Sequence, residues 1–284
     1  KTLTKRGAGQ LNLTGGIALA RLDVEGGQLR IAPSSGALDT AALQLAASAS
    51  IDISDNALIV RNGDVDALHA LVGNAFRGRW IGEGIGSQVA HDDATFLSAL
   101  GVFRNDDGAG SPLYASFAGV GNLLTNDVII ALVRYGDTDL NGLIDEADYA
   151  RMGSSPYWAG GDFNYDGEVN AIDYALIDYT AMLEGSPLFA DMHALHLGMY
   201  GQEYQQAFAA LEAGTFFVPE PTGVAYGLML AGGGLLRRRR SKASAASMEA
   251  GSPCRMRTSA ARSAGVYSSA SVVLVSVVIA RPST

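Results

Sequence analysis

Two acid-rich segments of the chain repeat one another. Residues 136–149 read GDTDLNGLIDEADY and residues 161–174 read GDFNYDGEVNAIDY, an offset of 25 residues. Counted from the first Asp of each segment, Asp or Asn stands at positions 1, 3 and 5, and Gly stands at position 6. This spacing is typical of loops that wrap around a calcium ion, because alternate side chains of a curled loop converge and Gly permits the sharp turn.

Each segment offers oxygen ligands for Ca²⁺ at positions 1, 3, 5, 7, 9 and 12, with the backbone carbonyl serving at position 7. In the first loop these positions hold Asp137, Asp139, Asn141, Leu143, Asp145 and Asp148. In the second loop they hold Asp162, Asn164, Asp166, Glu168, Asn170 and Asp173. We therefore predict two calcium ions. The alternative is a pair of ion-free turns, but residues 137–178 would then hold ten carboxylates against Arg151 alone.

The loops depart from an ordinary EF-hand in two ways. Position 12 is Asp rather than Glu, and residues 149–161 leave no room for a helix before the second loop. Each repeat is therefore predicted to be a loop followed by one helix, and residues 136–185 resemble a type I dockerin. The resemblance implies a cohesin-like partner. Positions 10 and 11 (Glu146/Ala147 and Ala171/Ile172) lack the small hydroxyl residues that dockerins use there, so another surface protein or a structural role is an alternative.

The first 50 residues are expected to form short β-strands. Apolar residues alternate with polar ones at Leu22/Val24 and Leu29/Ile31, and glycine pairs separate the strands. The pattern predicts a β-rich region that is either the edge of a solenoid or part of a sandwich. Residues 5–31 weakly resemble the autotransporter-associated β-strand repeat of large bacterial surface proteins.

Residues 51–133 are predicted to form a β-rich module of unknown activity. Asp64–Ala75 has the apolar spacing of a short helix, and Val128–Tyr135 reads as an apolar strand that leads into the first acid loop. The order of these elements resembles a module that precedes dockerin-like repeats in exported planctomycete and related bacterial proteins.

The calcium module is assigned to residues 134–215 and includes a trailing helix. Met192–Ala213 is helical in composition and is expected to form one long helix. Its predicted core face consists of Leu195, Met199, Tyr204, Phe208 and Leu211.

Residues 218–240 combine three features in order. They are the tripeptide Pro219, Glu220 and Pro221, an apolar run over 222–236, and the cluster Arg237, Arg238, Arg239 and Arg240. A helix over the apolar run spans about 22 Å, short of the roughly 30 Å hydrocarbon core, which predicts a transient membrane anchor. The segment resembles a PEP-CTERM sorting signal, and the resemblance implies processing by an exosortase. A buried hairpin or a chance apolar patch is the alternative.

Charge is divided unevenly along the chain. Residues 1–236 carry 11 Lys and Arg against 28 Asp and Glu, whereas the last 48 residues carry 9 against 1. The acidic part predicts repulsion of nucleic acid and attraction of cations. The low-complexity tail, residues 241–284, is interpreted as an extension without selected structure. Because Cys254 is the single cysteine, an internal disulfide framework is excluded.

No catalytic constellation stands out in the sequence. His193 and His196 stand three residues apart on the predicted helix but lack the Glu or Cys of a known zinc pattern. The sequence HDD at residues 91–93 is interpreted as part of a loop. Trp80 and Trp158 are interpreted as core or turn residues rather than as a sugar-binding surface.

These observations predict a multidomain β plus α chain: a β-rich N-terminal region, an α-helical dockerin-like module with two half-EF-hand loops, and a short C-terminal membrane segment. The predicted function is that of a non-enzymatic, exported cell-surface or extracellular-matrix protein, expected to be the C-terminal part of a longer precursor. Two alternatives remain open. The chain could be the end of a secreted polysaccharide-active enzyme whose catalytic domain lies upstream, or it could be a protein-docking or adhesion module.

Overall fold

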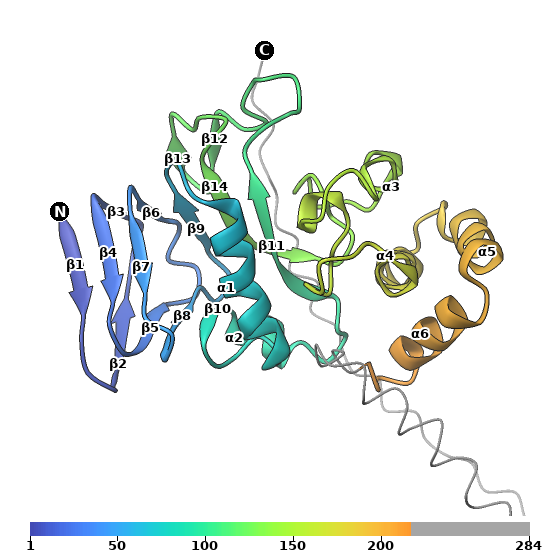
Figure 1. Cartoon of the computed structure of the whole chain (residues 1–284), viewed down its shortest axis with the longest axis horizontal. Helices are drawn as coiled ribbons and strands as arrows, with labels where there is room; N and C mark the ends of the chain where they lie inside the picture. Colours follow the sequence, from blue (N-terminus) through green and yellow to red (C-terminus); the bar gives the residue numbers. More distant parts are fainter. Residues whose placement is uncertain (217–284) are drawn as a thin grey trace, which may run out of the picture. The chain divides into compact units, whose positions relative to one another are not determined.

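The structure is a computed structural model that describes residues 1–216; the predicted sorting signal (218–240) and tail (241–284) lie outside the described residues. The first 60 residues wind three times through the same three sheets, as in a parallel β-solenoid (Figure 1). The strands of the three turns are β1 (Thr2–Lys5), β2 (Gln10–Leu13) and β3 (Ile17–Leu19); β4 (Arg21–Val24), β5 (Gly27–Ile31) and β6 (Leu38–Thr40); β7 (Leu43–Leu45), β8 (Ala49–Asp52) and β9 (Ala57–Val60).

Apolar side chains of successive turns stack in rows inside the solenoid. Leu3 of β1 pairs in register with Leu22 of β4, and Leu22 pairs with Leu43 of β7. Leu11, Leu29 and Ile51 form the equivalent row of the second sheet. Because strands one turn apart pair in parallel, the solenoid alternative of the sequence analysis holds and the sandwich does not. Each fully buried leucine of such a row contributes roughly 1.5–3 kcal/mol to stability.

After the third turn, the chain adds strands to the second and third sheets, but helices now precede these strands. After α1 (Val65–Arg77), β10 (Gly84–Gly86) joins the second sheet beside β8. After α2 (Gln88–Asp92), the antiparallel pair β11 (Ser98–Arg104) and β14 (Val128–Arg134) joins the third sheet beside β9. The strands β12 (Ser116–Phe117) and β13 (Val120–Gly121) form a small hairpin between them. The third solenoid turn spans residue 50, where the sequence suggested a boundary.

The helix α1 confirms the predicted helix near residues 64–75. Asp64 is its N-cap, with a side chain that accepts hydrogen bonds from two backbone amides of the first turn. Val65, Leu68 and Val72 are buried, as their spacing on one face predicts. The helix packs against β10 and β11 and thus covers the end of the solenoid.

The remaining elements are helical: α3 (Glu146–Arg151), the short 3₁₀ helix η1 (Trp158–Gly160), α4 (Ala171–Glu184), α5 (Phe189–Tyr200) and α6 (Gln202–Glu212). The prediction of one helix over 192–213 is wrong, because the chain breaks at Gly201, where φ is 60° and ψ is −125°. The predicted core face is correspondingly wrong in its first half. Leu195 and Met199 are 51% and 60% exposed, whereas Tyr204, Phe208 and Leu211 are buried.

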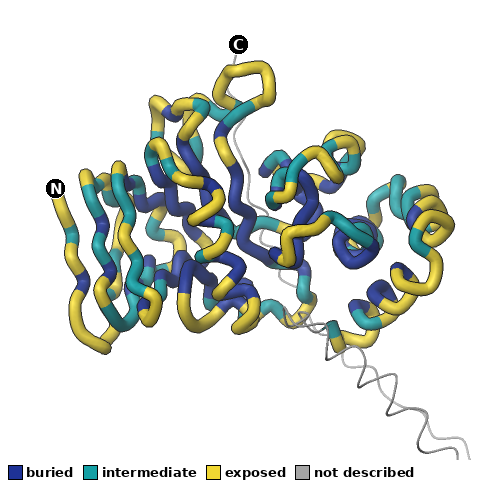
Figure 2. The backbone as a smooth tube through the Cα atoms, in the orientation of Figure 1, coloured by how far each residue is buried: buried dark blue, intermediate teal, exposed yellow. Residues whose placement is uncertain are grey.

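One apolar core extends from the solenoid to the helices. Figure 2 shows the buried backbone following the later strands (β8, β9, β11 and β14), one side of α1, and α4, while most of α5 is exposed. Trp158, Phe163 and Tyr165 are buried within this core, beside α1 and the β11–β14 pair. Within residues 1–216, no helix is both long enough and apolar enough to cross a membrane.

Candidate metal centre

The two acid loops have the same internal hydrogen bonds, position for position. The position-1 carboxylate (Asp137 or Asp162) accepts from the backbone amides of positions 5 and 6, with all four distances 3.1 Å. The position-3 side chain accepts from the amide of position 5, at 3.1 Å in the first loop and 2.9 Å in the second. The loops are therefore curled identically, and their first side chains turn inward.

The closing half of each loop repeats as well. The position-12 carboxylate accepts from the amide of position 2, at 2.7 Å for Asp148 and 2.9 Å for Asp173. Its second oxygen accepts from the amide of position 9, at 2.9 Å and 3.0 Å. This last bond completes a capping box, since Asp145 and Asn170 at position 9 are the N-caps of α3 and α4. Each loop thus leads directly into one helix, as predicted.

Backbone conformation explains why these loops need their glycines. Gly142 and Gly167 at position 6 have φ of 83° and 90°, values that L-residues rarely adopt. Position 4 is also left-handed in both loops, although Leu140 and Tyr165 occupy it, with φ of 60° and 58°. Two strained non-glycine residues at equivalent positions show that the duplicated sequence imposes a duplicated conformation.

The first loop brings three carboxylates together. Oxygen atoms of Asp137, Asp139 and Asp148 all lie within 4.8 Å of one another, a separation that suits joint coordination of one cation. Asp137 is 3% exposed and Asp148 is 0% exposed. One buried carboxylate cluster that could hold a metal ion is therefore present.

Electrostatics of this cluster favour a cation. Burial, and next the charge of Asp148, raises the pKa of Asp137 to about 7. Burial also raises the pKa of Asp148. Among residues 1–216, no lysine or arginine forms an ion pair with either carboxylate. Among the described residues, the negative charge of Asp137 is therefore offset by backbone amides and, below about pH 7, by a bound proton rather than by a cationic side chain.

The second loop is similar in fold but differs in its polar groups. Position 3 is Asn164, whose amide nitrogen donates to Oδ2 of Asp166 at 2.8 Å. Burial, and next the charge of Asp166, raises the pKa of Asp162 to about 6, and burial raises the pKa of Asp173 well above its ordinary value. The imidazole Nε2 of His69, on α1, lies 3.6 Å from Oδ2 of Asp162 and has no hydrogen-bond partner within residues 1–216.

The remaining predicted ligands lie at the outer side of the loops. Asn141, Leu143, Asp166 and Glu168 are exposed, and Leu143 and Glu168 at position 7 were predicted to offer the backbone carbonyl rather than the side chain. The carbonyl oxygen of Asp137 accepts a hydrogen bond from the buried indole of Trp158 at 3.1 Å, which fixes the start of the first loop to the core.

Sequence reasoning missed a buried polar network behind the loops. Asp178 of α4 is 0% exposed, and its Oδ2 lies 2.7 Å from Nδ1 of His196 and accepts a 2.6 Å hydrogen bond from the hydroxyl of Tyr204. His193 instead pairs with the hydroxyl of Tyr204. The two histidines therefore have separate structural partners. The one signal in the sequence was a single acid on the otherwise apolar face of α4, at Ala175, Asp178 and Ala181.

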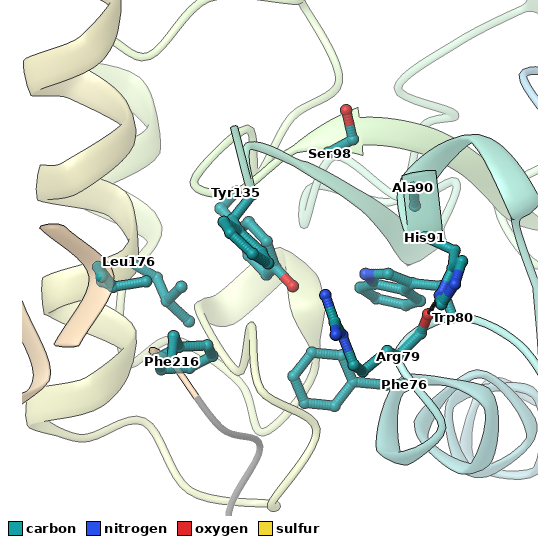
Figure 3. A pocket seen from close by; sticks show the side chains of 11 residues that line it. Phe76, Arg79, Trp80, Ala90, His91, Ser98, Tyr135, Leu176 and Phe216 are labelled. Atoms are coloured by element: carbon teal, nitrogen blue, oxygen red, sulfur yellow. Dashed lines mark hydrogen bonds between the residues drawn. The ribbon is translucent and has the colours of Figure 1, made fainter. Parts of the chain in front are cut away.

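A pocket elsewhere in the fold is lined mainly by aromatic rings. Figure 3 shows Phe76, Trp80 and Tyr135 around it, with the side chain of Arg79 extending among these rings and His91 beside Trp80. Nδ1 of His91 pairs with the carbonyl oxygen of Arg79 at 2.7 Å. The expected loop at 91–93 is instead the end of α2: His91 and Asp92 are helical, and Asp93 is the C-cap, whose carboxylate accepts from the amides of Thr95 and Ser98.

Comparison with known proteins gives no further assignment. No protein-family model, no curated protein and no solved structure matches the chain.

Proposed function

We propose that the chain is a non-enzymatic, exported cell-surface or extracellular-matrix protein whose two acid loops bind calcium and thereby stabilise the junction between β-solenoid and helices. The observation that carries the proposal is the duplicated loop, in which seven equivalent hydrogen bonds recur at the same offset as the sequence repeat.

The donor set fits a hard divalent cation. The candidate ligands are oxygen atoms of Asp, Asn and backbone groups, which suit Ca²⁺, whereas zinc sites use Cys and His. The first site would be held by Asp137, Asp139 and Asp148, and the second by the equivalent residues Asp162, Asn164 and Asp173. The ion would supply the positive charge that the surrounding protein lacks. Asp137 and Asp148 would then remain ionised in spite of their burial.

The location of the loops supports a structural role. The first follows β14 directly and leads into α3, and the second leads into α4. Tyr165, at position 4 of the second loop, has its ring against Phe76 and Trp80 of the β-rich part. An ion in the second loop would therefore hold together elements that are far apart in sequence, since that loop contacts α1 and leads into α4.

Thermal unfolding of the full chain tests the calcium proposal. If each loop binds with a Kd of about 10⁻⁴–10⁻³ M, as extracellular calcium modules do, then 10 mM Ca²⁺ adds about 1.4–2.7 kcal/mol per site by mass action. We expect a higher Tm in calcium than in chelator, and a smaller effect of Mg²⁺. An unchanged melting curve at millimolar calcium would contradict the proposal.

Export and sorting rest on the PEP-CTERM resemblance. The tripeptide at 219–221, the apolar run 222–236 and the arginines 237–240 support a transient membrane anchor that an exosortase processes. Mass spectrometry of the surface protein should give a C-terminus near residue 221. An intact mass that ends at Thr284 would contradict both the processing and the interpretation of the tail.

A docking or adhesion module is the second candidate, and α5 supports it. Leu195 and Met199 lie one turn apart on this helix and are 51% and 60% exposed, and Leu197 on another face is 37% exposed. Exposed apolar residues gathered on one helix favour contact with another protein. A pull-down that recovers no calcium-dependent partner would count against this candidate and leave the structural role unaffected.

A further inference from the structure

His69 of α1 faces the second acid loop. Its side chain is 13% exposed and contacts two tyrosine rings, with centroid distances of 5.5 Å to Tyr157 and 4.5 Å to Tyr165. One turn further along α1, a Cβ at Gly73 would lie 3.2 Å from the Cβ of Tyr165. The helix and the loop are therefore in close contact at two successive turns of α1, and the two rings restrict the orientation of the imidazole.

The imidazole directs a buried nitrogen at the first candidate ligand of this loop. Nε2 of His69 lies 3.6 Å from Oδ2 of Asp162, and no polar atom within residues 1–216 is its hydrogen-bond partner. This separation is too long for a hydrogen bond, but a shift of about 0.7 Å would bring it to the usual length of about 2.9 Å. Because buried polar atoms in folded proteins are nearly always hydrogen-bonded, Asp162 is the acceptor that this nitrogen is placed to use.

The two side chains are complementary when the loop holds a cation. Burial, opposed by the charge of Asp66, lowers the pKa of His69 to about 4, so the imidazole is neutral at pH 7 and has an N–H to donate. Within the loop, Asp162 accepts from the amides of Asp166 and Gly167. A carboxylate that binds a cation is ionised, and ionised acceptors form the stronger hydrogen bonds. From outside the loop, His69 brings a further donor toward Oδ2 of this carboxylate.

The first acid loop differs from the second in this respect. Among the described residues, no histidine pairs with Asp137, and the carboxylate of Asp137 accepts from amides of its own loop. The two loops nevertheless share the internal hydrogen bonds described above. The chain therefore contains its own comparison, with two loops of the same form, one of which has an imidazole beside its position-1 carboxylate.

We propose that His69 is a positioning residue of the second acid loop: when calcium is bound, its Nε2–H donates to Oδ2 of Asp162 and orients that carboxylate toward the ion. The inference rests on the proposed calcium function and adds to it a residue from outside both loops. Partners that hydrogen-bond to a metal ligand in this way change metal affinity by about 10–100-fold. The affinity for the second ion would thus depend on α1, whereas the affinity for the first ion would not.

Calorimetric titration of the full chain with calcium tests the inference one loop at a time. The Asp137→Asn chain reports the second loop. In this chain, His69→Phe keeps an aromatic ring but removes the N–H, and we expect the Kd to rise about tenfold. His69→Gln places an amide N–H near the position of Nε2 and should restore most of the affinity. In the Asp162→Asn chain, which reports the first loop, neither substitution should change the Kd.

Nitrogen NMR of labelled histidine side chains gives a readout that a packing role would not move. Calcium should shift the Nε2 signal of His69 toward that of a hydrogen-bonded N–H in the Asp137→Asn chain. The same signal should stay unchanged in the Asp162→Asn chain. His69→Phe assigns the signal by its loss, and its Tm in chelator should be no lower than that of the parent, because the substitution removes a nitrogen that has no partner in the ion-free protein.

The outcomes distinguish this inference from the calcium proposal. Absence of calcium binding in the parent chain would overturn both. Calcium binding with the same Kd before and after His69→Phe would overturn the inference alone. Equal losses with His69→Phe and His69→Gln, or a loss at the first loop as well, would overturn it by showing an effect of packing. Zinc binding that is tighter than calcium binding and is lost with His69→Gln would overturn it by showing that the imidazole binds the metal directly.

Discussion

The hydroxyl of Tyr149 donates a 2.8 Å hydrogen bond to Oδ1 of Asp178. Tyr149 directly follows the position-12 carboxylate of the first acid loop, and Asp178 is buried in the middle of α4. The other oxygen of Asp178 is bonded to His196 of α5 and Tyr204 of α6. The carboxylate of Asp178 on α4 is therefore hydrogen-bonded to side chains of α3, α5 and α6. One of these three partners, Tyr149, is adjacent to the candidate calcium ligand Asp148.

The substitution Tyr149→Phe should destabilise the protein by about 1–3 kcal/mol, because it removes one donor from a buried carboxylate. Chemical denaturation measures the free energy of unfolding. Tyr179→Phe is the matched control, since Tyr179 neighbours Asp178 but its hydroxyl makes no hydrogen bond within residues 1–216. The control should stay within about 0.5 kcal/mol of the parent. Equal losses in the two variants would show that the Tyr149 hydrogen bond contributes nothing.

The break between α5 and α6 predicts opposite effects for two nearby glycines. Gly201 has φ of 60° and ψ of −125°, which an alanine adopts only with strain, so Gly201→Ala should cost about 1–3 kcal/mol. Gly198 lies within α5, where alanine has the higher helix propensity, and Gly198→Ala should stabilise by up to about 1 kcal/mol. A Cβ would meet no atom within 4 Å at either position. Thermal melts that moved in the same direction for both variants would contradict the backbone explanation.

Stability of the calcium-free protein should fall as pH rises. Burial raises the pKa of Asp137 to about 7 and that of Asp162 to about 6, above the value of about 3.9 in an unfolded chain. Between about pH 4 and 7 the folded protein thus holds more protons than the unfolded one, so the free energy of unfolding decreases with pH. Calcium competes with these protons, and its effect on Tm should be large near pH 7.5 and small near pH 5.

Melting curves with chelator and with calcium, across this pH range, check the prediction. The double variant Asp137→Asn, Asp162→Asn should reduce the pH dependence of the calcium-free protein, since it removes two of the four loop carboxyl groups whose pKa burial raises. A calcium-free Tm that increases between pH 5 and 7.5 would contradict the expected direction of this pH dependence.

The acid loops could be predicted from sequence because their geometry is local. The spacing of Asp, Asn and Gly places each acceptor within a few residues of its donor, and the observed hydrogen bonds join positions of the same loop. The helix that follows each loop was predictable for the same reason. The lengths of those helices differ, six residues for α3 and fourteen for α4, because only α4 is packed between α5 and α6.

Other features depend on contacts between residues far apart in the sequence, and they could not be predicted from the sequence alone. The alternation at Leu22/Val24 and Leu29/Ile31 is the same in a solenoid and a sandwich, and only the pairing of strands distinguishes them. Gly201 stands within a stretch of good helix formers, so composition alone predicts that the helix continues. The position of Asp178 on an apolar face of α4 hints at burial, but its partners Tyr149, His196 and Tyr204 belong to three other helices and could not be identified from the sequence.

Calcium stoichiometry of the full chain, measured by titration calorimetry, tests the central claim most directly. We expect two ions per chain, one fewer after Asp137→Asn and one fewer after Asp162→Asn. Asp106→Asn, in an exposed turn where the carboxylate accepts from the amide of Gly108, should leave both ions in place. Absence of binding at millimolar calcium, or two ions retained in both loop variants, would contradict calcium binding by the acid loops.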